Sequence, residues 1–186
     1  MSYRRLCKDH SMDNNTWRTG LNNNDAIIGP SGSGKSFLAE RLSEKHGLPH
    51  YDLDDVRWDR TAGKYGVKQP DEVRDRLLSE LAAQSDWIIE GVYYAWVSQS
   101  FARADVIYLL DMPQGLCRRR ILRRFFLRKL LRPKDGRWES LASVRALLQW
   151  TKKYHREALP KIREMLKSYP NVICITSKKA FRALYT

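Results

Sequence analysis

The feature that most constrains the fold of this chain is the segment 29–36, which reads Gly-Pro-Ser-Gly-Ser-Gly-Lys-Ser. It fits the pattern G-x-x-x-x-G-K-[ST], in which a glycine-rich loop joins a buried strand to the N-terminus of a helix. The flanking residues agree, because residues 26–28 are apolar and residues 37–42 carry apolar side chains at helical spacing. The segment therefore predicts an α/β fold with a phosphate-binding loop after a strand.

Each fixed position of this loop has a mechanical reason. We expect Gly29, Gly32 and Gly34 to take positive φ values, so that the backbone can approach a polyphosphate closely. Consecutive backbone N–H groups would then bind the anion, helped by the N-terminus of the following helix. Lys35 would reach the β- and γ-phosphates, and the Ser36 hydroxyl would coordinate Mg²⁺. A loop of this kind is typical of ATP- and GTP-using proteins. Because the chain contains no Asn-Lys-x-Asp segment, we set a GTPase aside and expect ATP and Mg²⁺ as cofactors. The residues expected to hold the nucleotide here are Gly29, Ser31, Gly32, Ser33, Gly34, Lys35, Ser36 and Phe37.

The chain has 186 residues, a length that fits one domain with a full hydrophobic core. No stretch is long and apolar enough to cross a membrane, and the first 25 residues contain no apolar segment of a signal peptide. Cys7, Cys117 and Cys174 are widely spaced and form no C-x-x-C pair, which argues against a disulfide framework or a zinc site. We therefore expect a cytoplasmic protein without membrane partners.

The net charge of +13 is concentrated in the second half of the chain. Residues 1–112 carry 14 Lys and Arg against 17 Asp and Glu, whereas residues 113–170 carry 17 against 4. A block of this kind attracts polyanions such as nucleotide phosphates, nucleic acid or a membrane surface. The charge thus supports a second hypothesis, a nucleic-acid-binding ATPase or regulator, although no named DNA-binding module can be recognised.

Strand-like and helix-like segments alternate along the chain. The expected strands lie at residues 26–28, 50–53, 87–89, 106–110 and 172–175. The expected helices lie at about 34–46, from 70, 113–131, 139–158, from 160 and from 179. This alternation predicts a parallel sheet covered by helices on both faces, with ligands bound where the strands end. Residues 1–24 show neither the two-residue period of a strand nor the 3.6-residue period of a helix. They are interpreted as a loosely ordered extension of a domain that spans residues 25–186.

Taken together, these segments resemble the adenylate-kinase and shikimate-kinase branch of P-loop small-molecule kinases, and above all a bacterial group of adenylate-kinase-like or DNA topology modulation proteins. The resemblance covers roughly residues 26–186. It depends on the loop at 29–36, Leu-Asp-Asp-Val-Arg-Trp at 53–58, Trp-Ile-Ile-Glu-Gly-Val-Tyr at 87–93, Leu-Asp-Met-Pro at 110–113, the arginine helix, and Ile-Thr-Ser-Lys-Lys at 175–179. It implies a three-layer P-loop NTPase fold, with a five-stranded parallel sheet in the order 2-3-1-4-5 and a helical lid at about 113–158.

The resemblance also implies where the ligands bind. The adenine ring would lie against residues 176–178, so Lys178 is expected to bind the nucleotide. The acceptor of the phosphoryl group would lie over the second strand. Adenylate kinases have Asp-Gly-Phe-Pro-Arg after the third strand, whereas this chain has Glu-Gly-Val-Tyr-Tyr at 90–94. Because the arginine of that motif is missing, the resemblance does not support AMP as the acceptor.

Three carboxylates that follow expected strands are candidates for catalysis. Glu90 would lie beside the loop strand and hold the water shell of Mg²⁺; the alternative is a strand-end acid in a turn. Asp54 would position the acceptor hydroxyl and accept its proton, whereas an N-cap is an equally good interpretation of Asp55. Asp111 looks like the acid of a Walker B motif, but it stands just before a proline and a helix start, so capping is the better interpretation.

The basic segment after Pro113 has apolar residues at helical spacing between its arginines. Arg120 and Arg124 lie four residues apart and share one face of the helix. They are the candidates for clamping the phosphoryl group while it is transferred. For Arg118 and Arg128, a solvated basic face is the better interpretation.

These observations predict an ATP- and Mg²⁺-dependent kinase that phosphorylates a small molecule, such as a nucleoside, a nucleotide or another hydroxyl-bearing metabolite. The residues expected to act in catalysis are Lys35, Asp54, Glu90, Arg120 and Arg124, and those expected to hold the metal are Ser36 and Glu90. The alternative is the nucleic-acid-binding ATPase or regulator, which would use the basic second half of the chain. Both a monomer and a homodimer are compatible with the sequence.

Overall fold

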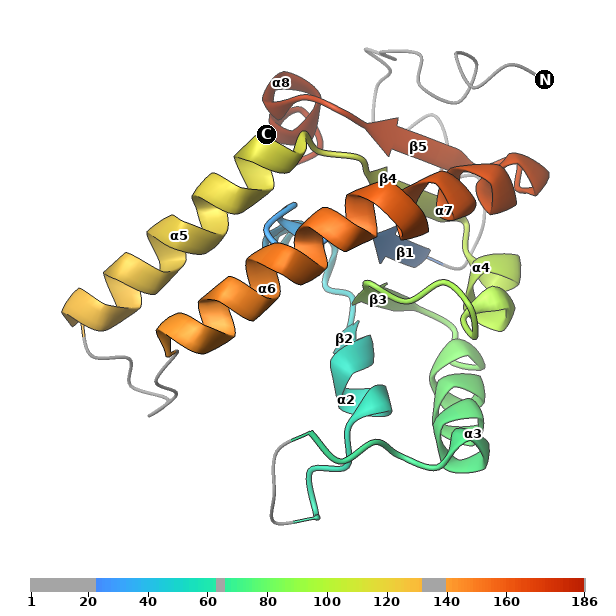
Figure 1. Ribbon diagram of the computed structural model, residues 1–186. Helices are drawn as coiled ribbons and strands as arrows, with labels where there is room; N and C mark the ends of the chain where they lie inside the picture. Colours follow the sequence, from blue (N-terminus) through green and yellow to red (C-terminus); the bar gives the residue numbers. More distant parts are fainter. Residues whose placement is uncertain (1–22, 63–65, 132–139, 186) are drawn as a thin grey trace.

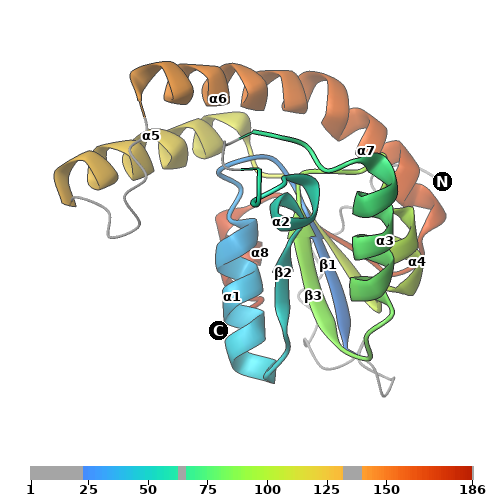
Figure 2. The same ribbon diagram turned by 90° about the horizontal axis from the view of Figure 1, so that it is seen from below.

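The computed structural model describes residues 23–62, 66–131 and 140–185, and a five-stranded parallel sheet forms its centre (Figure 1). The strands lie in the order β2-β3-β1-β4-β5, so the predicted order 2-3-1-4-5 is confirmed. Helices cover both faces, which gives the predicted three-layer α/β architecture (Figure 2). The strands are β1 (Asn24–Ile28), β2 (His50–Asp52), β3 (Trp87–Gly91), β4 (Val106–Leu110) and β5 (Val172–Ile175).

Helices connect the strands or follow them. The longer helices are α1 (Lys35–His46), α3 (Asp71–Ala82), α5 (Gln114–Leu131), α6 (Leu141–Lys153) and α7 (Leu159–Met165). The short ones are α2 (Leu53–Arg57), α4 (Ser98–Arg103), α8 (Lys178–Arg182) and the 3₁₀ turn η3 (Leu166–Ser168). A π-helical turn, η2 (Tyr154–Ala158), joins α6 to α7. Across the described ranges, no helix combines the length and the apolar character needed to cross a membrane.

The strand β1, which leads into the phosphate-binding loop, lies at the centre of the sheet. It pairs with β3 on one side and β4 on the other, and Ile27 stands opposite Glu90 of β3. Every residue of β1 is buried, including the polar Asn24 and Asp25. Strand β2 follows on the outer side of β3, where Asp52 pairs with Glu90. The carboxyl ends of these strands therefore bring the loop and two carboxylates to one edge of the sheet.

Alternate side chains of β1 point to opposite faces of the sheet, as the geometry of a strand requires. Ala26 and Ile28 belong to one apolar cluster, together with residues of α3, α4 and α7. Ile27 belongs to the other, together with residues of α1 and α8. Figure 2 shows the same division, with α1 on one side of the sheet and α3 and α4 on the other. Burial on both faces explains why the central strands read as continuous apolar runs.

The helices α5 and α6 lie side by side over the edge of the sheet that carries the loop (Figures 1 and 2). Ile121 and Phe125 of α5 and Val144 of α6 form a small apolar cluster between them. The helix α6 begins at a capping box, in which the Ser140 hydroxyl accepts the N–H of Ser143 at 3.0 Å. The two helices make up most of the region 113–158 that the sequence assigns to a lid. Their connection at 132–139 lies outside the described residues.

Several boundaries differ from the sequence-based expectations. Asn24 is assigned to the N-terminal extension, but it is the first residue of β1, and its N–H donates to Asp105 at 2.8 Å. The extension at 1–22 lies outside the described residues. The helix expected at 139–158 runs as an α-helix only to Lys153 and continues as the π-helical turn. The helices α2 and α4 were not predicted, because five or six residues show too little periodicity.

Candidate functional site

The loop at 29–36 has the expected conformation at two of its three glycines. Gly32 and Gly34 have φ values of 79° and 105°, in the left-handed region that favours glycine. Gly29 does not take a positive φ, so that expectation is wrong. This glycine is needed for close packing instead, because a Cβ atom there would lie 2.9 Å from the backbone oxygen of Leu110. The start of the loop is therefore packed tightly against the end of β4.

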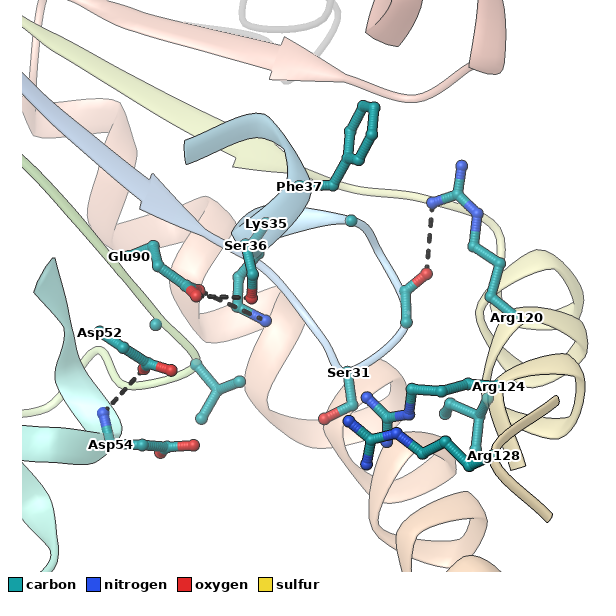
Figure 3. Close-up of a pocket in the computed structure, with 15 residues that line it drawn as sticks. Ser31, Lys35, Ser36, Phe37, Asp52, Asp54, Glu90, Arg120, Arg124 and Arg128 are labelled. Atoms are coloured by element: carbon teal, nitrogen blue, oxygen red, sulfur yellow. Dashed lines mark hydrogen bonds and ion pairs between the residues drawn. The ribbon is translucent and has the colours of Figure 1, made fainter. Parts of the chain in front are cut away.

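A cavity of about 590 Å³ opens beside this loop, and we call it the loop cavity (Figure 3). Its walls come from the loop and the start of α1, from the ends of β2 and β3, from α2, and from one face of α5. The residues that line it include Ser31, Gly32, Gly34, Lys35, Ser36, Phe37, Asp52, Asp54, Glu90, Arg120, Arg124 and Arg128. A space of this size can hold a small-molecule ligand. Most of the residues that sequence reasoning selected therefore line one space.

Lys35, Ser36 and Glu90 form the centre of the loop cavity. The Ser36 hydroxyl donates to a Glu90 carboxylate oxygen at 2.6 Å, and the Lys35 ammonium lies 4.0 Å from the same carboxylate. Lys35 also donates to the Pro30 carbonyl at 3.4 Å, which ties its ammonium to the loop. Glu90 is 2% exposed. It reaches this place because β3 is the neighbour of β1, as the resemblance implied.

The electrostatics around Glu90 bear on metal binding. Burial raises the pKa of Glu90 above its usual value, whereas the Lys35 ammonium and the Ser36 hydroxyl lower it. Within the described residues, no group of three His, Cys, Asp or Glu side chains could hold a metal ion. Mg²⁺ that is bound through phosphates needs only one or two protein oxygens and keeps several waters. Ser36 and Glu90 therefore fit a Mg²⁺ ion that takes its other ligands from phosphates and water.

Two further carboxylates lie across the loop cavity from the arginines of α5 (Figure 3). The Asp52 side chain accepts the backbone N–H of Asp54 at 2.9 Å and so caps α2. Burial and the neighbouring Glu90 raise the pKa of Asp52 to about 6. Asp54 accepts a hydrogen bond from the Tyr93 hydroxyl at 2.7 Å. Sequence reasoning selected Asp54 but missed Asp52 and Tyr93. Asp52 enters the site through the register of β2 with β3, which places it opposite Glu90.

Arg120 contacts the loop itself. Its guanidinium donates to the backbone carbonyl of Gly32 at 3.3 Å and to that of Ser33. Ser33, which was expected to bind the nucleotide, has a fully buried side chain. Arg120 therefore holds the outer side of the loop, and its guanidinium also lies 5.5 Å from the Phe181 ring.

Arg124 and Arg128 continue the same face of α5 and extend toward Ser31 (Figure 3). Arg128 thus lines the loop cavity and is half-buried, whereas a solvated face was the sequence-based interpretation. The signal that could have found it is its position four residues after Arg124, on the same side of the helix. Arg118 is exposed, as expected.

Phe37 and Lys178 lie together at a second cavity, of about 460 Å³, which we call the Lys178 cavity. It shares Phe37 and Arg120 with the loop cavity. Phe37 stacks on Phe181 with ring centroids 6.2 Å apart. Lys178 is the first residue of α8 and follows the end of β5 after two residues, at the same edge of the sheet. The two residues that were expected to bind one nucleotide therefore line one cavity, which adjoins the loop cavity.

The loop and its surrounding strands are also the part of the chain that known proteins share. The sequence profile of the AAA domain family matches residues 26–125, which is more than half of the chain. The chain belongs to the AAA domain family. The matched part of this AAA domain includes the loop, Glu90, Arg120 and Arg124. Among curated proteins, none matches the chain.

The chain is also similar to solved structures of other proteins. A gluconokinase from Sinorhizobium meliloti 1021 has a TM-score of 0.51 at 14% identity, over 88% of this chain and 89% of that chain. A shikimate kinase from Acinetobacter baumannii has a TM-score of 0.44 at 19% identity, over 81% of this chain and 96% of that chain. The similarity to the gluconokinase shows that the three-layer fold is shared.

Asp111, which follows β4, has a strong partner on α7. Arg163 of α7 donates to its two carboxylate oxygens at 2.9 and 2.7 Å. Both donors come from one planar guanidinium, so the pair is bidentate. The acid at this position therefore joins β4 to α7, a role that neither the Walker B interpretation nor the capping interpretation included.

We expect Asp52→Asn to stabilise the AAA domain at pH 8 and to change its stability little at pH 4. The pKa of Asp52 is about 6 in the folded state, above the usual 3.8, so ionisation disfavours folding. This cost grows as the pH rises from about 3.8 to about 6 and is constant above that range. Asparagine keeps the capping oxygen but carries no charge. Because the side chain is partly exposed, we discount the shift and expect a gain on the order of 1 kcal/mol, or about 2–4 °C in Tm.

Thermal denaturation followed by circular dichroism at the two pH values measures this effect. Glu72→Gln is the control, because Glu72 is an exposed carboxylate in the first turn of α3 that does not line the loop cavity. An equal rise in Tm at pH 4 and pH 8 would contradict the charge-based explanation.

Proposed function

We propose that this protein transfers the γ-phosphoryl group of Mg²⁺-bound ATP to a hydroxyl group of a small molecule. The loop cavity supports this most strongly, because a lysine, a hydroxyl-bonded carboxylate, two further carboxylates and three arginines line one space. Phosphoryl transfer needs positioning and positive charge around the moving group, together with a carboxylate for the acceptor hydroxyl. The gluconokinase that shares the fold is by its name a kinase of a small molecule, which agrees with this proposal.

On the nucleotide side, the backbone N–H groups of the loop would bind the phosphates, and Lys35 would contact the β- and γ-phosphates. Ser36 and Glu90 would hold Mg²⁺, which supplies charge neutralisation at the phosphate oxygens when it is bound. The base would lie in the Lys178 cavity. Phe37 is 42% exposed and packs on the buried Phe181, so it offers aromatic surface there for a flat ring.

On the acceptor side, Asp54 would orient the hydroxyl and take its proton. Tyr93 supports this role, because its hydrogen bond fixes one oxygen of the Asp54 carboxylate. Arg124 and Arg128 would balance the charge on the phosphoryl oxygens from the opposite wall. Arg120 would keep the loop in place through its carbonyl contacts. Movement of α5 and α6 as a lid would exclude water, so that the acceptor competes with hydrolysis.

The basic second half of the chain supports the alternative, a nucleic-acid-binding ATPase. Part of that charge lines the loop cavity on α5, but other arginines such as Arg118 are exposed. ADP release that rises with duplex DNA at physiological salt, and with no small acceptor, would favour this alternative. The narrower resemblance to adenylate-kinase-like or DNA topology modulation proteins stays a prediction.

Acceptor-dependent ADP release tests the proposed function. We expect at least one hydroxyl-bearing compound from a panel of nucleosides, sugars and alcohols to raise ADP release above the acceptor-free rate. Asp54→Asn should then reduce that acceptor-dependent rate by about 10²-fold or more, because the hydroxyl loses its proton acceptor. Asp55→Asn is the matched control and should stay within about twofold, since Asp55 does not line the cavity. Equal losses in the two variants would contradict the role of Asp54.

A further inference from the structure

A third cavity, of about 390 Å³, lies between the segment that follows β3 and the junction of α6 with α7. We call it the aromatic cavity, because the side chains that line it include Tyr93, Tyr94, Trp96, Trp150 and Tyr154. Val92 lines both the aromatic cavity and the loop cavity, so the two adjoin. The volume falls within the range of roughly 300–1,000 Å³ that small-molecule sites have.

Four of the aromatic side chains form two pairs on two separate parts of the chain. The Tyr93 and Trp96 rings have centroids 5.1 Å apart, and the same distance separates the Trp150 and Tyr154 rings. The Arg74 guanidinium lies 5.0 Å from the Trp96 ring and helps to fix it. Trp150 is 38% exposed, so apolar ring surface stays in contact with water. A flat apolar ligand would remove this surface from water.

Tyr93 connects the aromatic cavity to the acceptor side of the loop cavity. Its hydroxyl donates to Asp54 at 2.7 Å, while its ring packs on Trp96. A molecule whose hydroxyl group lies at Asp54 can therefore extend past Val92 and place its other end among the aromatic rings. The geometry suits an acceptor with two parts, a hydroxyl-bearing arm and a flat ring.

Tyr154 adds a polar requirement for that ring. Its hydroxyl is buried and has no hydrogen-bond partner among the described residues, and Tyr154 lines the aromatic cavity. Burial raises the pKa of Tyr154, so the hydroxyl keeps its proton and can donate. An unsatisfied buried hydroxyl is unfavourable, and a ring nitrogen or a carbonyl oxygen of a ligand would satisfy it.

We propose that the phosphate acceptor carries a planar aromatic ring, which binds in the aromatic cavity and accepts a hydrogen bond from Tyr154. This inference rests on the proposed function, because the acceptor hydroxyl is assigned to Asp54. Two sources share this chemistry: nucleosides, whose hydroxyl groups lie on the sugar, and aryl alcohols with a ring nitrogen. Sugar acids and other acceptors without an aromatic ring would leave the aromatic surface uncovered.

Equilibrium dialysis at saturating Mg²⁺ and AMP-PNP tests the inference, because the nucleotide analogue occupies the nucleotide site. The ring probes are adenosine and thymidine for nucleosides, and pyridoxine and pyridine-3-methanol for aryl alcohols. Gluconate and shikimate carry no aromatic ring and are the comparison. We expect at least one ring probe to bind about tenfold more tightly than gluconate or shikimate. Whether a nucleoside or an aryl alcohol binds then identifies the class of acceptor. The inference is overturned if no ring probe binds, or if gluconate or shikimate binds as tightly.

Two variants test the named contacts. Trp150→Ala should weaken binding of the ring probe by about tenfold or more, because stacking surface is lost. Phe126→Ala is the matched control, since Phe126 is 64% exposed on α5 and does not line the aromatic cavity. Tyr154→Phe should weaken binding by about fivefold, yet it should keep or raise the Tm, because it removes an unsatisfied hydroxyl. A lower Tm with unchanged affinity would indicate a purely structural hydroxyl and would overturn the Tyr154 contact.

The affinity for AMP-PNP separates this inference from the proposed function. If the wild-type protein fails to bind Mg²⁺ and AMP-PNP, the proposed function and this inference are both overturned. If it binds them normally, but binding of the ring probe is insensitive to Trp150→Ala and Tyr154→Phe, only the inference about the aromatic ring is overturned.

Discussion

Lys35→Ala is expected to reduce ATP turnover by on the order of 10³-fold or more and to weaken ATP binding. The Lys35 ammonium lies 4.0 Å from Glu90 and is largely buried, so water screens its charge little. Alanine removes this charge from the phosphates and also removes the ammonium that lowers the pKa of Glu90. The pKa of Glu90 then rises further, so its carboxyl group is more readily protonated and supports Mg²⁺ less well. Steady-state ADP release and calorimetric titration with ATP measure the two effects separately.

Lys45→Ala is the matched control, because Lys45 is an exposed lysine in the last turn of the same helix, α1. It changes the net charge by the same amount but lies outside the loop cavity. Equal losses of ATP binding and turnover in the two variants would mean that both depend only on the overall charge of the protein. Unchanged ATP binding and turnover in a folded Lys35→Ala protein would contradict the proposed function outright.

The nucleotide half of the candidate site could be predicted from the sequence because it is local. The loop at 29–36 is contiguous, and the helix that follows it supplies the anion-binding N–H groups. Glu90 and Asp54 could be added because parallel strands end at one edge of a sheet. Gly29 shows the limit of local reasoning. Its requirement for glycine comes from Leu110, which is distant in sequence and adjacent only in the folded chain.

The acceptor half could not be predicted in the same way, because its parts meet only through tertiary packing. Asp52 enters the site through the register of β2 against β3, which the sequence does not specify. The aromatic cavity combines residues 92–96 with residues near the end of α6. Taken alone, Trp150 and Tyr154 are compatible with ordinary helix packing. A half-exposed ring and an unsatisfied hydroxyl become visible only when both parts of the cavity are in place.

Arg124→Lys is expected to lower kcat by on the order of 10²-fold while the KM for ATP changes by less than about threefold. Arg124 lines the loop cavity and extends toward Ser31, on the wall opposite the acceptor carboxylates (Figure 3). A guanidinium can donate to two phosphoryl oxygens at once, whereas an ammonium acts as a single compact charge. The geometry of the donors matters most when charge spreads over the transferring group, so the loss should fall on kcat.

Arg118→Lys is the control for this substitution, because Arg118 lies on the same helix, is exposed, and does not line the loop cavity. It should leave both constants unchanged, since a solvated arginine and a solvated lysine differ little in their effect on a distant ligand. If Arg124→Lys instead raised the KM for ATP and left kcat unchanged, Arg124 would only attract the triphosphate in the ground state. A loss of kcat that occurs only in Arg124→Lys would establish that α5 stabilises the transition state through an arginine that lines the loop cavity.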